Sequence, residues 1–526
     1  MMARRHAFGV LAFLVIACRA VPRGAEGVVT RAAEQSARSE GLGHVVFPNS
    51  GPERAQELFL RGVLLLHSFE YPDAAEAFRG AQELAPDFAL AYWGEALAHC
   101  HPIWQEEDRE AAQLVLARLA PTPAERATKA GDEREGALLA SVEVLFGEGT
   151  RAERARLYCD ALALLQARYP NDLELAAFHA LAILGTATQG RDVPTYMRAA
   201  AVAEEVLERA PDHPGALHYA IHSYDDPTHA PLGLRMARRY GVVAAAAEHA
   251  LHMPSHIYVA LGMWEDSVAA NVAAAAAADA RRARKGLEVD ARGFHSLVWL
   301  AYSHLQLGNT GAAERLLADM RRDEREKSTR RTRASLVSMR SAHVVALQTW
   351  EGELARFEVA LDDLEPDTAC AELYVRGRAA LARGEIERAR AALAMMAEHR
   401  GPLETLDPAA GTAAQCCTTG RTNYLPSRLA AQVMELELSG LIALQAGAQE
   451  DALARLAGAA EKEDALGDDF GPPAVVEPAH ELLGQVLHDL GRPAEAAREF
   501  EAALERAPGR ARSLYGLAAA GARAVP

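Results

Sequence analysis

The sequence predicts an all-α protein, an α-solenoid in which antiparallel helix pairs stack side by side. The chain has 526 residues, too many for one compact core unless the core repeats. Half of the residues are apolar and 24% are charged, as in folded globular proteins. The same spacing of small residues, phenylalanine and proline occurs near both ends of the chain, which predicts an array of repeats between them.

The N-terminus has the pattern of an export signal, assigned to residues 1–18. Two arginines precede an apolar run that is too short to span a bilayer as a helix. The run ends in Val-Ile-Ala-Cys, which resembles the lipobox of bacterial lipoproteins and implies acylation of Cys18 and a membrane anchor on the periplasmic side. The alternative is an ordinary secretory signal and a secreted or soluble periplasmic protein. Residues 19–52, with scattered glycine and proline, are expected to be a flexible tether.

Two stretches of the chain share one pattern of small, large and proline residues. Counted from Ala55 or from Glu477 as the first place, glycine stands at place 8, alanine at 20, phenylalanine at 24, alanine at 27 and proline at 32. Small residues let two helices approach closely, and the proline ends the second helix. The residues are Gly62, Ala74, Phe78, Ala81 and Pro86 in the first stretch and Gly484, Ala496, Phe500, Ala503 and Pro508 in the second.

This pattern resembles the tetratricopeptide repeat family, in which each repeat is a pair of antiparallel helices in about 34 residues. The resemblance implies a right-handed superhelix whose first helices line a concave groove that binds a protein or peptide. The stretch His-Met-Pro-Ser-His-Ile at 252–257 also resembles a bacterial exported subgroup of such proteins.

The array is expected to continue between the two clear copies. Five glycines follow an apolar helix pattern and precede another at a constant place, where the repeat turns: Gly262, Gly308, Gly384, Gly447 and Gly491. The predicted parts are N-terminal repeats at 53–135, central histidine-rich repeats at 136–320, divergent repeats with a basic segment and a loop at 321–427, and C-terminal repeats with a capping helix at 428–526.

Two segments of the divergent part have distinct compositions. The arginine-rich run 321–333 is expected to be a solvated helix between repeats, with contact to lipid phosphate as the alternative. The stretch 401–427, rich in glycine, proline and threonine, predicts a long loop that holds the adjacent Cys416 and Cys417. No other ligand type is spaced near this cysteine pair, so a redox or metal role there has no support from spacing.

Seven of the 19 histidines fall within residues 213–256. His218 and His222 occupy places 5 and 9 of one repeat, and His252 and His256 occupy the same places of the next. His249 and His295 each stand at place 2 of a repeat. The family resemblance implies that these places face the groove, so four to six imidazoles are expected to converge there.

Two interpretations of the histidines compete. Imidazole nitrogens of His218, His222, His252 and His256, with His249 or His295 as further candidates, could bind a transition metal such as zinc, copper or iron. Asp225 or Asp226 could add a carboxylate, as in non-haem iron sites. The alternative is a polar hydrogen-bonded layer, or a groove that binds an acidic or pH-dependent peptide. Pro254 favours a helix start, which predicts that the spacing of His252 to His256 is disturbed. His67 is a further groove candidate, or a satisfied residue of the helix wall.

The sequence narrows the possible functions to two hypotheses. The net charge of −17, from 72 acidic and 55 basic residues, opposes binding to a phosphate backbone, and we expect no nucleic-acid partner. The sequence has no phosphate-binding loop, nucleophile elbow or His-Glu-x-x-His pattern. The first hypothesis is a membrane-tethered scaffold that binds a protein or peptide in its groove. The second is a metal-binding protein or metal-dependent enzyme that uses the histidine cluster.

Overall fold

The computed structural model describes residues 41–188, 190–401, 425–466 and 471–524, and almost all of them belong to helices or short helix connections. The predicted signal, Cys18, Cys416 and Cys417 lie outside the described residues. Within the described residues, the all-α solenoid is confirmed: consecutive helices pack on one another along the chain, and strands occur only as a two-residue pair. No described helix is both long enough and apolar enough to cross a membrane.

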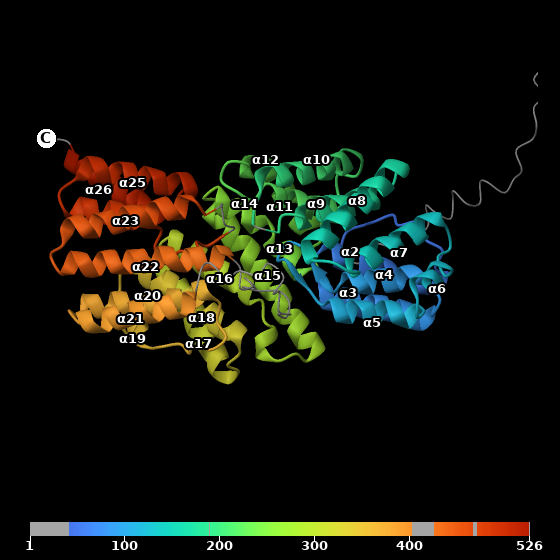
Figure 1. The fold of residues 1–526 in the computed structure, drawn as a ribbon, viewed down its shortest axis with the longest axis horizontal. Helices are drawn as coiled ribbons and strands as arrows, with labels where there is room; N and C mark the ends of the chain where they lie inside the picture. Colours follow the sequence, from blue (N-terminus) through green and yellow to red (C-terminus); the bar gives the residue numbers. More distant parts are fainter. Residues whose placement is uncertain (1–40, 189, 402–424, 467–470, 525–526) are drawn as a thin grey trace, which may run out of the picture.

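The N-terminal half forms one end of an elongated body (Figure 1). Its strands, β1 (Cys100–His101) and β2 (Glu106–Glu107), pair antiparallel. Its helices are α2 (Glu53–His67), α3 (Tyr71–Leu84), α4 (Ala89–Leu97), α5 (Arg109–Leu119), α6 (Pro123–Ala127), α7 (Glu133–Leu145), α8 (Arg151–Arg168), α9 (Leu173–Gly185), α10 (Val193–Arg209), α11 (Pro214–Ser223), α12 (Ala230–Val243), α13 (Glu248–His252) and α14 (Pro254–Ala260).

The C-terminal half forms the opposite end of the body (Figure 1). It consists of α15 (Trp264–Lys285), the 3₁₀ turn η1 (Val289–Ala291), α16 (Phe294–Gln306), α17 (Thr310–Glu326), α18 (Arg330–Leu347), α19 (Glu353–Arg356), α20 (Pro366–Ala382), α21 (Ile386–Arg400), α22 (Leu425–Gln445), α23 (Gln449–Asp464), α24 (Ala479–Asp489), α25 (Pro493–Arg506) and α26 (Ala511–Ala524).

The small residues of the predicted repeat lie where two helices pack closely or where the chain turns. A Cβ atom on Gly62 would lie 2.7 Å from the ring of Phe78, and one on Gly484 would lie 3.1 Å from the ring of Phe500. Both glycines therefore allow close packing within a helix pair. The five predicted turn glycines all adopt left-handed φ values between 68° and 80°, which explains why glycine stands at each turn.

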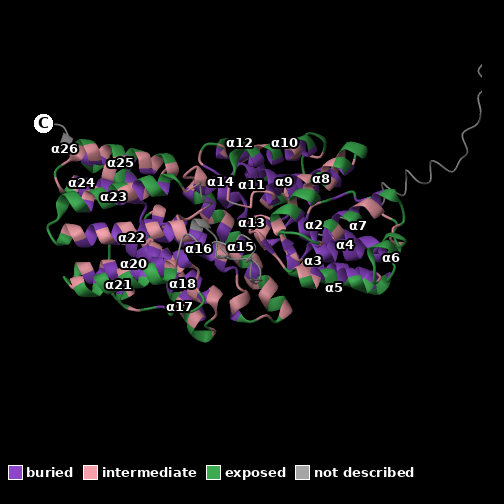
Figure 2. Ribbon diagram, viewed as in Figure 1, coloured by how far each residue is buried: buried purple, intermediate pink, exposed green. Residues whose placement is uncertain are grey.

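The buried residues form two large apolar cores (purple in Figure 2). One core runs from Leu42 to Tyr258 and the other from Phe294 to Ala520. A small cluster lies at the junction and consists of Val259, Trp264, Trp299 and Tyr302. The middle of the chain is thus where two separately packed halves meet.

The C-terminal repeat folds back onto this junction. The indole Nε1 of Trp264 donates to the carbonyl of Gly509 at 3.0 Å, and the backbone N–H of Ala511 donates to Gln306 Oε1 at 3.0 Å. Gly471 lies so close to Trp299 that a Cβ atom there would be 2.1 Å from the indole. The C-terminal segments thereby cover part of the surface that an open superhelix would expose.

The predicted tether is wrong in its last part. Leu42, Val45 and Phe47 are buried at 1–2% exposure, and the Phe47 ring packs against Phe59 and Trp93. The free energy gained by burying these apolar side chains outweighs the flexibility that glycine and proline give the segment. The rest of the tether, 19–40, lies outside the described residues.

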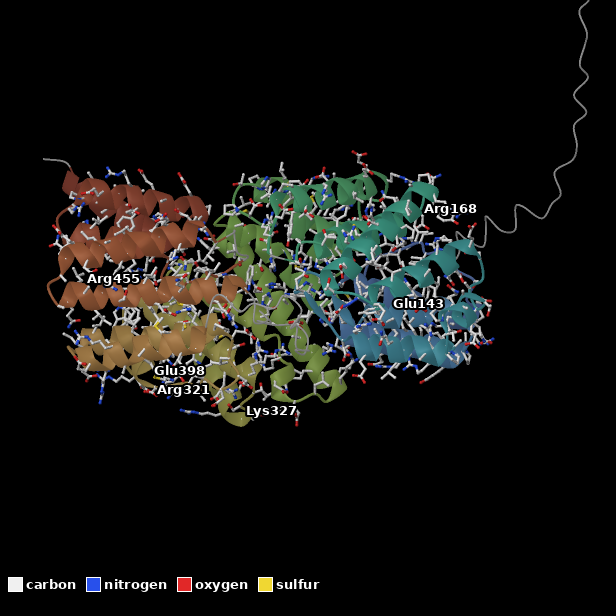
Figure 3. All side chains as sticks on the ribbon, viewed as in Figure 1. Glu143, Arg168, Arg321, Lys327, Glu398 and Arg455 are labelled. Atoms are coloured by element: carbon white, nitrogen blue, oxygen red, sulfur yellow. The ribbon has the colours of Figure 1, made fainter. Side chains whose placement is uncertain are left out.

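The basic segment is not one solvated helix. It is divided between the end of α17 and the start of α18, and its charges are paired. Arg321 forms an ion pair with Glu353 at 3.2 Å, and Lys327 forms one with Asp290 at 2.9 Å (both bases are labelled in Figure 3). The predicted loop 401–427 ends earlier than expected, since α22 already begins at Leu425, and residues 402–424 lie outside the described part.

Candidate metal centre

Histidines from three consecutive repeats meet in the middle of the chain. Helix α14 contacts both α11 and α13, and α15 joins α13 and α14 to α16. Residues four apart lie on one face of a helix, so each His-x-x-x-His pair projects together. The six predicted ligands are all brought into this region: His218, His222, His249, His252, His256 and His295.

Their donor atoms form two groups of three, within each of which all donor atoms lie within 4.8 Å of one another. Triad A is His218, His222 and His249, and triad B is His252, His256 and His295. A third group at the same spacing links the triads and contains His222, Asp225 and His256. The four-histidine shell expected from the repeat spacing is therefore replaced by two adjoining three-histidine groups.

Pro254 does not disturb the second pair. Met253, between α13 and α14, keeps helical dihedral angles of −52° and −36°. The ring centroids of His252 and His256 are 5.0 Å apart, compared with 4.9 Å for His218 and His222. The prediction that proline disturbs this spacing is wrong, because proline is compatible with the first turn of the helix that it begins.

Three of the six histidines are oriented by an oxygen at Nδ1. His218 Nδ1 lies 2.6 Å from the carbonyl oxygen of His67, His252 Nδ1 lies 2.7 Å from Asn271 Oδ1, and His256 Nδ1 lies 2.5 Å from Asp225 Oδ2. These oxygens accept hydrogen bonds, so the ring proton is on Nδ1 in each case. The Nε2 lone pair of each ring is then directed into the cluster, which is how protein ligands to metals are usually oriented.

The assignment is firm at His252, because the amide of Asn271 is itself fixed. Asn271 Nδ2 donates to the carbonyl of Ser267 at 2.9 Å, so Oδ1 is the atom that faces His252. His252 Nε2 then lies 3.1 Å from His256 Nε2. With a proton on each Nδ1, the two Nε2 atoms face each other across this distance, and either a proton or a metal ion joins them.

Triad A contains donor atoms that no described group satisfies. His218 Nε2 and His249 Nε2 are buried, and neither has a hydrogen-bond partner among the described residues. Such buried polar atoms are rare in folded proteins and cost roughly 1–3 kcal/mol each when nothing binds them.

Five of the six imidazoles are held in the neutral form. Burial lowers the pKa of each well below the ordinary histidine value, and repulsion between neighbouring imidazoles lowers it further. A neutral imidazole has the free lone pair that a metal requires. The five residues are His218, His222, His249, His252 and His295.

The cluster opens on a cavity of about 820 Å³ between the two halves of the protein. Histidines of both triads form one wall, and the rest is mainly apolar and aromatic. The Trp299 ring lies over His256, with ring centroids 4.4 Å apart. Trp264, Trp299 and Tyr302 belong to the apolar cluster at the junction and also line the cavity.

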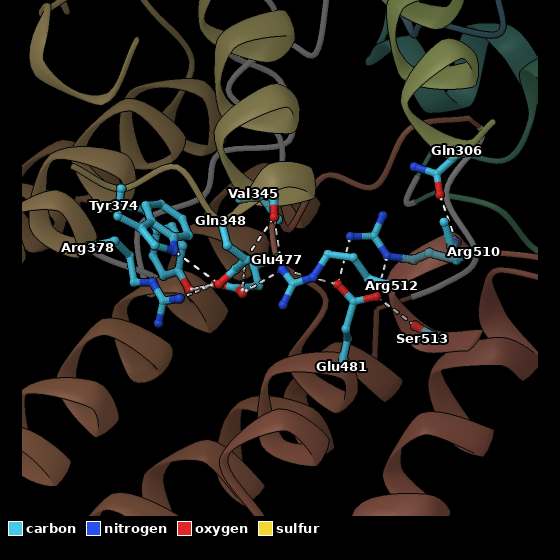
Figure 4. Close-up of polar contacts among 12 residues, drawn as sticks. Gln306, Val345, Gln348, Tyr374, Arg378, Glu477, Glu481, Arg510, Arg512 and Ser513 are labelled. Atoms are coloured by element: carbon cyan, nitrogen blue, oxygen red, sulfur yellow. Dashed lines mark hydrogen bonds and ion pairs between the residues drawn. The ribbon is translucent and has the colours of Figure 1, made fainter. Parts of the chain in front are cut away.

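Arg510 and Arg512, from another wall of the cavity, belong to a buried ion network (Figure 4). Glu477 accepts from Tyr374 at 2.7 Å and pairs with Arg512 at 2.9 Å and Arg378 at 3.3 Å. Burial alone would raise the pKa of Glu477, but attraction to the two arginines outweighs it and lowers the pKa to about 2. A neighbouring carboxylate, that of Glu481, pairs with Arg510 at 2.7 Å. The charges on this wall are thus internally compensated.

Two predicted site residues have other roles. The side chain of His67 is buried away from the cavity, where its ring contacts Tyr219 and Glu174 at 2.8 Å each. Asp226 pairs with Arg191 and accepts the backbone N–H of His229 at 2.8 Å. His67 is thus the satisfied wall residue given as its alternative, and Asp226 as a ligand is wrong, because strong buried partners already hold both groups.

Sequence reasoning missed several residues that shape the site. Asn271 orients His252 from α15, and Ile103 and Trp104 of the β1–β2 connection line the cavity. Asn271 carries no spacing signal, since it comes from the second helix of its repeat. The hairpin interrupts the repeat altogether. His101 of β1 stacks on Tyr71.

Comparisons with known proteins support the repeat. Residues 478–510 match the family described as Tetratricopeptide repeat. No curated protein matches the sequence. Similar solved structures include yeast Tom70, with 11% identity over 90% of this chain and 96% of that chain and a TM-score of 0.32. The human IFIT1 dimer with PPP-AAAA has 11% identity over 88% of this chain and 95% of that chain and a TM-score of 0.37. The APC/C hetero-tetramer Cut9-Hcn1 has 12% identity over 90% of this chain and 78% of that chain and a TM-score of 0.37. Likenesses of this size carry no conclusion about what this chain binds.

Proposed function

We propose that this protein binds a transition metal at the histidine cluster and presents it to a small ligand in the adjoining cavity. The observation that carries the proposal is the 3.1 Å contact between His252 Nε2 and His256 Nε2. Two nitrogens at this distance share either a proton or a metal ion. Two nitrogens that bind one ion at about 2.0–2.1 Å, roughly 90–110° apart at the ion, are about 2.8–3.4 Å from each other.

The donor set favours copper or zinc. Imidazole nitrogens bind zinc, copper, nickel and iron, and copper has the highest intrinsic affinity in this series. Iron would use the group of His222, Asp225 and His256 as two histidines and a carboxylate. However, Asp225 Oδ2 already holds the Nδ1 proton of His256. We therefore assign Asp225 to orientation of His256.

The cavity supports a small, largely apolar ligand. Its volume of about 820 Å³ lies within the usual range for small-molecule sites. Aromatic and aliphatic side chains dominate its walls, and the arginines that line it are paired with glutamates. A metal ion in the cluster would supply Lewis-acid or redox chemistry at one end of this cavity.

Elemental analysis tests the proposal. Untagged protein without residues 1–18 is purified beside a variant with His218→Ala and His256→Ala, one change in each triad. His399→Ala is the matched control, since His399 is exposed on α21. We expect near-stoichiometric metal in the parent and the control and its loss in the double variant. Only trace metal in the parent, after growth with added copper and zinc, would contradict the proposal.

A protein-binding scaffold is the second candidate. The C-terminal repeat matches a family named for this repeat, and solenoids of stacked helix pairs present extended concave surfaces. The C-terminal repeat folds back on the centre, so a long peptide in the groove would require that contact to open. Pull-down from a cell-envelope extract, with and without His218→Ala and His256→Ala, tests this candidate: a partner lost in the variant supports it.

We also propose export and an N-terminal lipid anchor, as in the bacterial subgroup that the sequence resembles. The support is the sequence of residues 1–18, with Cys18 after small and apolar residues. Metabolic labelling with a radioactive fatty acid tests it. Label in the parent that disappears in Cys18→Ser is expected. Equal labelling of both, or of neither, would reject the anchor.

A further inference from the structure

We infer that the histidine cluster is a dinuclear centre, with one metal ion in triad A and a second in triad B. This inference rests on the proposed function, because it specifies how many ions the cluster holds and where. It is carried by four features of the site: the grouping of the donors, the nitrogens in each triad that a cation would satisfy, the partners that orient the rings from behind, and the link between the triads.

The grouping of donors excludes a single central ion. Ligand atoms at about 2.0–2.1 Å from one ion lie no more than about 4.2 Å from one another. The six histidines come within 4.8 Å of one another only three at a time among the described residues. Small adjustments of side chains would complete either triad around an ion, whereas one ion for all six would require the helices to move.

Each triad contains nitrogen atoms that a bound cation would satisfy. In triad A, His218 Nε2 and His249 Nε2 are buried without a hydrogen-bond partner among the described residues. In triad B, His252 Nε2 and His256 Nε2 lie 3.1 Å apart, a separation that suits two nitrogens bound to one ion. An ion in one triad would not bind the nitrogens of the other, since His218 and His249 belong to one group of donors and His252 and His256 to another.

Each triad also has at least one ring oriented from behind. The carbonyl oxygen of His67 fixes His218 in triad A, and Asn271 and Asp225 fix His252 and His256 in triad B. Such partners typically accompany metal-binding histidines. The triads therefore resemble each other in construction as well as in composition, and helix α13 contributes one histidine to each.

The two ions would be neighbours. His222 of triad A and His256 of triad B have ring centroids 5.6 Å apart, and their donor atoms lie within 4.8 Å of a carboxylate oxygen of Asp225. His222, His249, His256 and His295 line the cavity, so both ions would face the same ligand space. Three neutral nitrogens per ion leave open positions for a ligand that bridges the two metals.

Copper provides the test, because two close Cu²⁺ ions couple their unpaired electrons and lose paramagnetic resonance intensity. Metal-free protein is titrated with Cu²⁺, dialysed, and measured for bound copper and for spin intensity per copper. Two double variants each remove two ligands of one triad and spare the linking residues: His218→Ala with His249→Ala, and His252→Ala with His295→Ala. His399→Ala is the control, and helicity and thermal unfolding identify variants that fail to fold. His→Gln versions replace any that do.

We expect two copper ions per chain in the parent and the control, with spin intensity well below the copper content. Each triad variant should bind one ion per chain with full intensity. One ion per chain in the parent, or two ions with full intensity, would overturn the dinuclear inference while the proposed metal site stands. The inference would equally fail if either folded triad variant bound no copper. Absence of copper from the parent would reject both.

Discussion

At the scale of single residues, the decisive groups are those behind the histidines. Asp225 accepts the Nδ1 proton of His256 at 2.5 Å and is itself buried, so it fixes which nitrogen faces the cluster. Asn271 does the same for His252. These partners determine a tautomer, and the tautomer determines whether a metal can bind.

Replacement of Asp225 by asparagine should weaken metal binding without removing a ligand. The amide is a weaker acceptor than the carboxylate, and it can present a donor to Nδ1 and select the wrong tautomer. We expect about a 10- to 100-fold loss of affinity, measured by competition with a chelator. Asp212→Asn, in an exposed ion pair with Arg239, is the control and should leave affinity unchanged. Equal affinities in both variants would remove Asp225 from the site.

The depressed pKa values of the histidines predict a specific pH profile. Protons compete with metal only below the pKa of a ligand, and burial lowers the pKa of His218 and His252 well below the ordinary range. Affinity should therefore be nearly constant from pH 8 to pH 6 and fall only under more acidic conditions. Chelator competition at unit pH intervals measures this. A steep loss between pH 8 and pH 6 would show that the ligands titrate as ordinary histidines.

The set of six histidines could be predicted from sequence, but its division into triads A and B could not. Places 2, 5 and 9 of successive repeats identify the members because the repeat fixes their face. The division depends on how α13, α14 and α16 are offset, and on Asn271 and the His67 carbonyl, which no repeat spacing indicates. For His67, sequence spacing leaves two alternatives open, because it does not reveal the buried contact with Glu174.

At the scale of helix pairs, stability depends on close approach within each repeat. Gly62 packs directly on Phe78, and Gly94 approaches the same ring from the next helix. The repeat spacing predicted the first contact, because glycine and phenylalanine at fixed places are its signature. The interruption by β1 and β2 was not predictable in this way, since no periodic pattern covers residues 100–107.

Gly62→Ala should destabilise the protein, since the added methyl group would lie 2.7 Å from the Phe78 ring. Overpacking of this kind costs about 1–3 kcal/mol. Gly458→Ala is the matched control: it also lies within a helix, and no atom lies within 4 Å of the added carbon. There we expect a gain of up to about 1 kcal/mol from helix propensity. Urea unfolding compares the two, and equal effects would contradict the packing argument.

At the scale of the whole molecule, the chain closes on itself around the cavity. Residues 245 positions apart, Trp264 and Gly509, share a hydrogen bond, and the ion network of Figure 4 fixes α26 against α18 and α20. Sequence could predict the stack of helices, since each repeat carries its own pattern. It could not predict closure, because that depends on the summed rotation of many repeats and on contacts with no local signal.

Glu477 should make the closed form sensitive to acid. Its pKa of about 2 in the folded protein lies below the ordinary 4.5, so its stabilising contribution is complete above about pH 4.5 and is lost as the pH falls toward 2. Glu477→Gln should therefore lower the free energy of unfolding by about 3 kcal/mol at pH 7 and reduce its decline below pH 4.5. Urea unfolding at several pH values measures both effects. A parallel decline in parent and variant would show that Glu477 is not the responsible carboxylate.

The central claim is that a metal ion lies among these histidines, and anomalous X-ray diffraction tests it most directly. Crystals of the copper-loaded protein are measured on both sides of the copper absorption edge. The account predicts an anomalous peak about 2.0–2.1 Å from both His252 Nε2 and His256 Nε2, with a second peak beside His218 Nε2 and His249 Nε2. Copper bound elsewhere in the crystal, with no anomalous density in either triad, would contradict it.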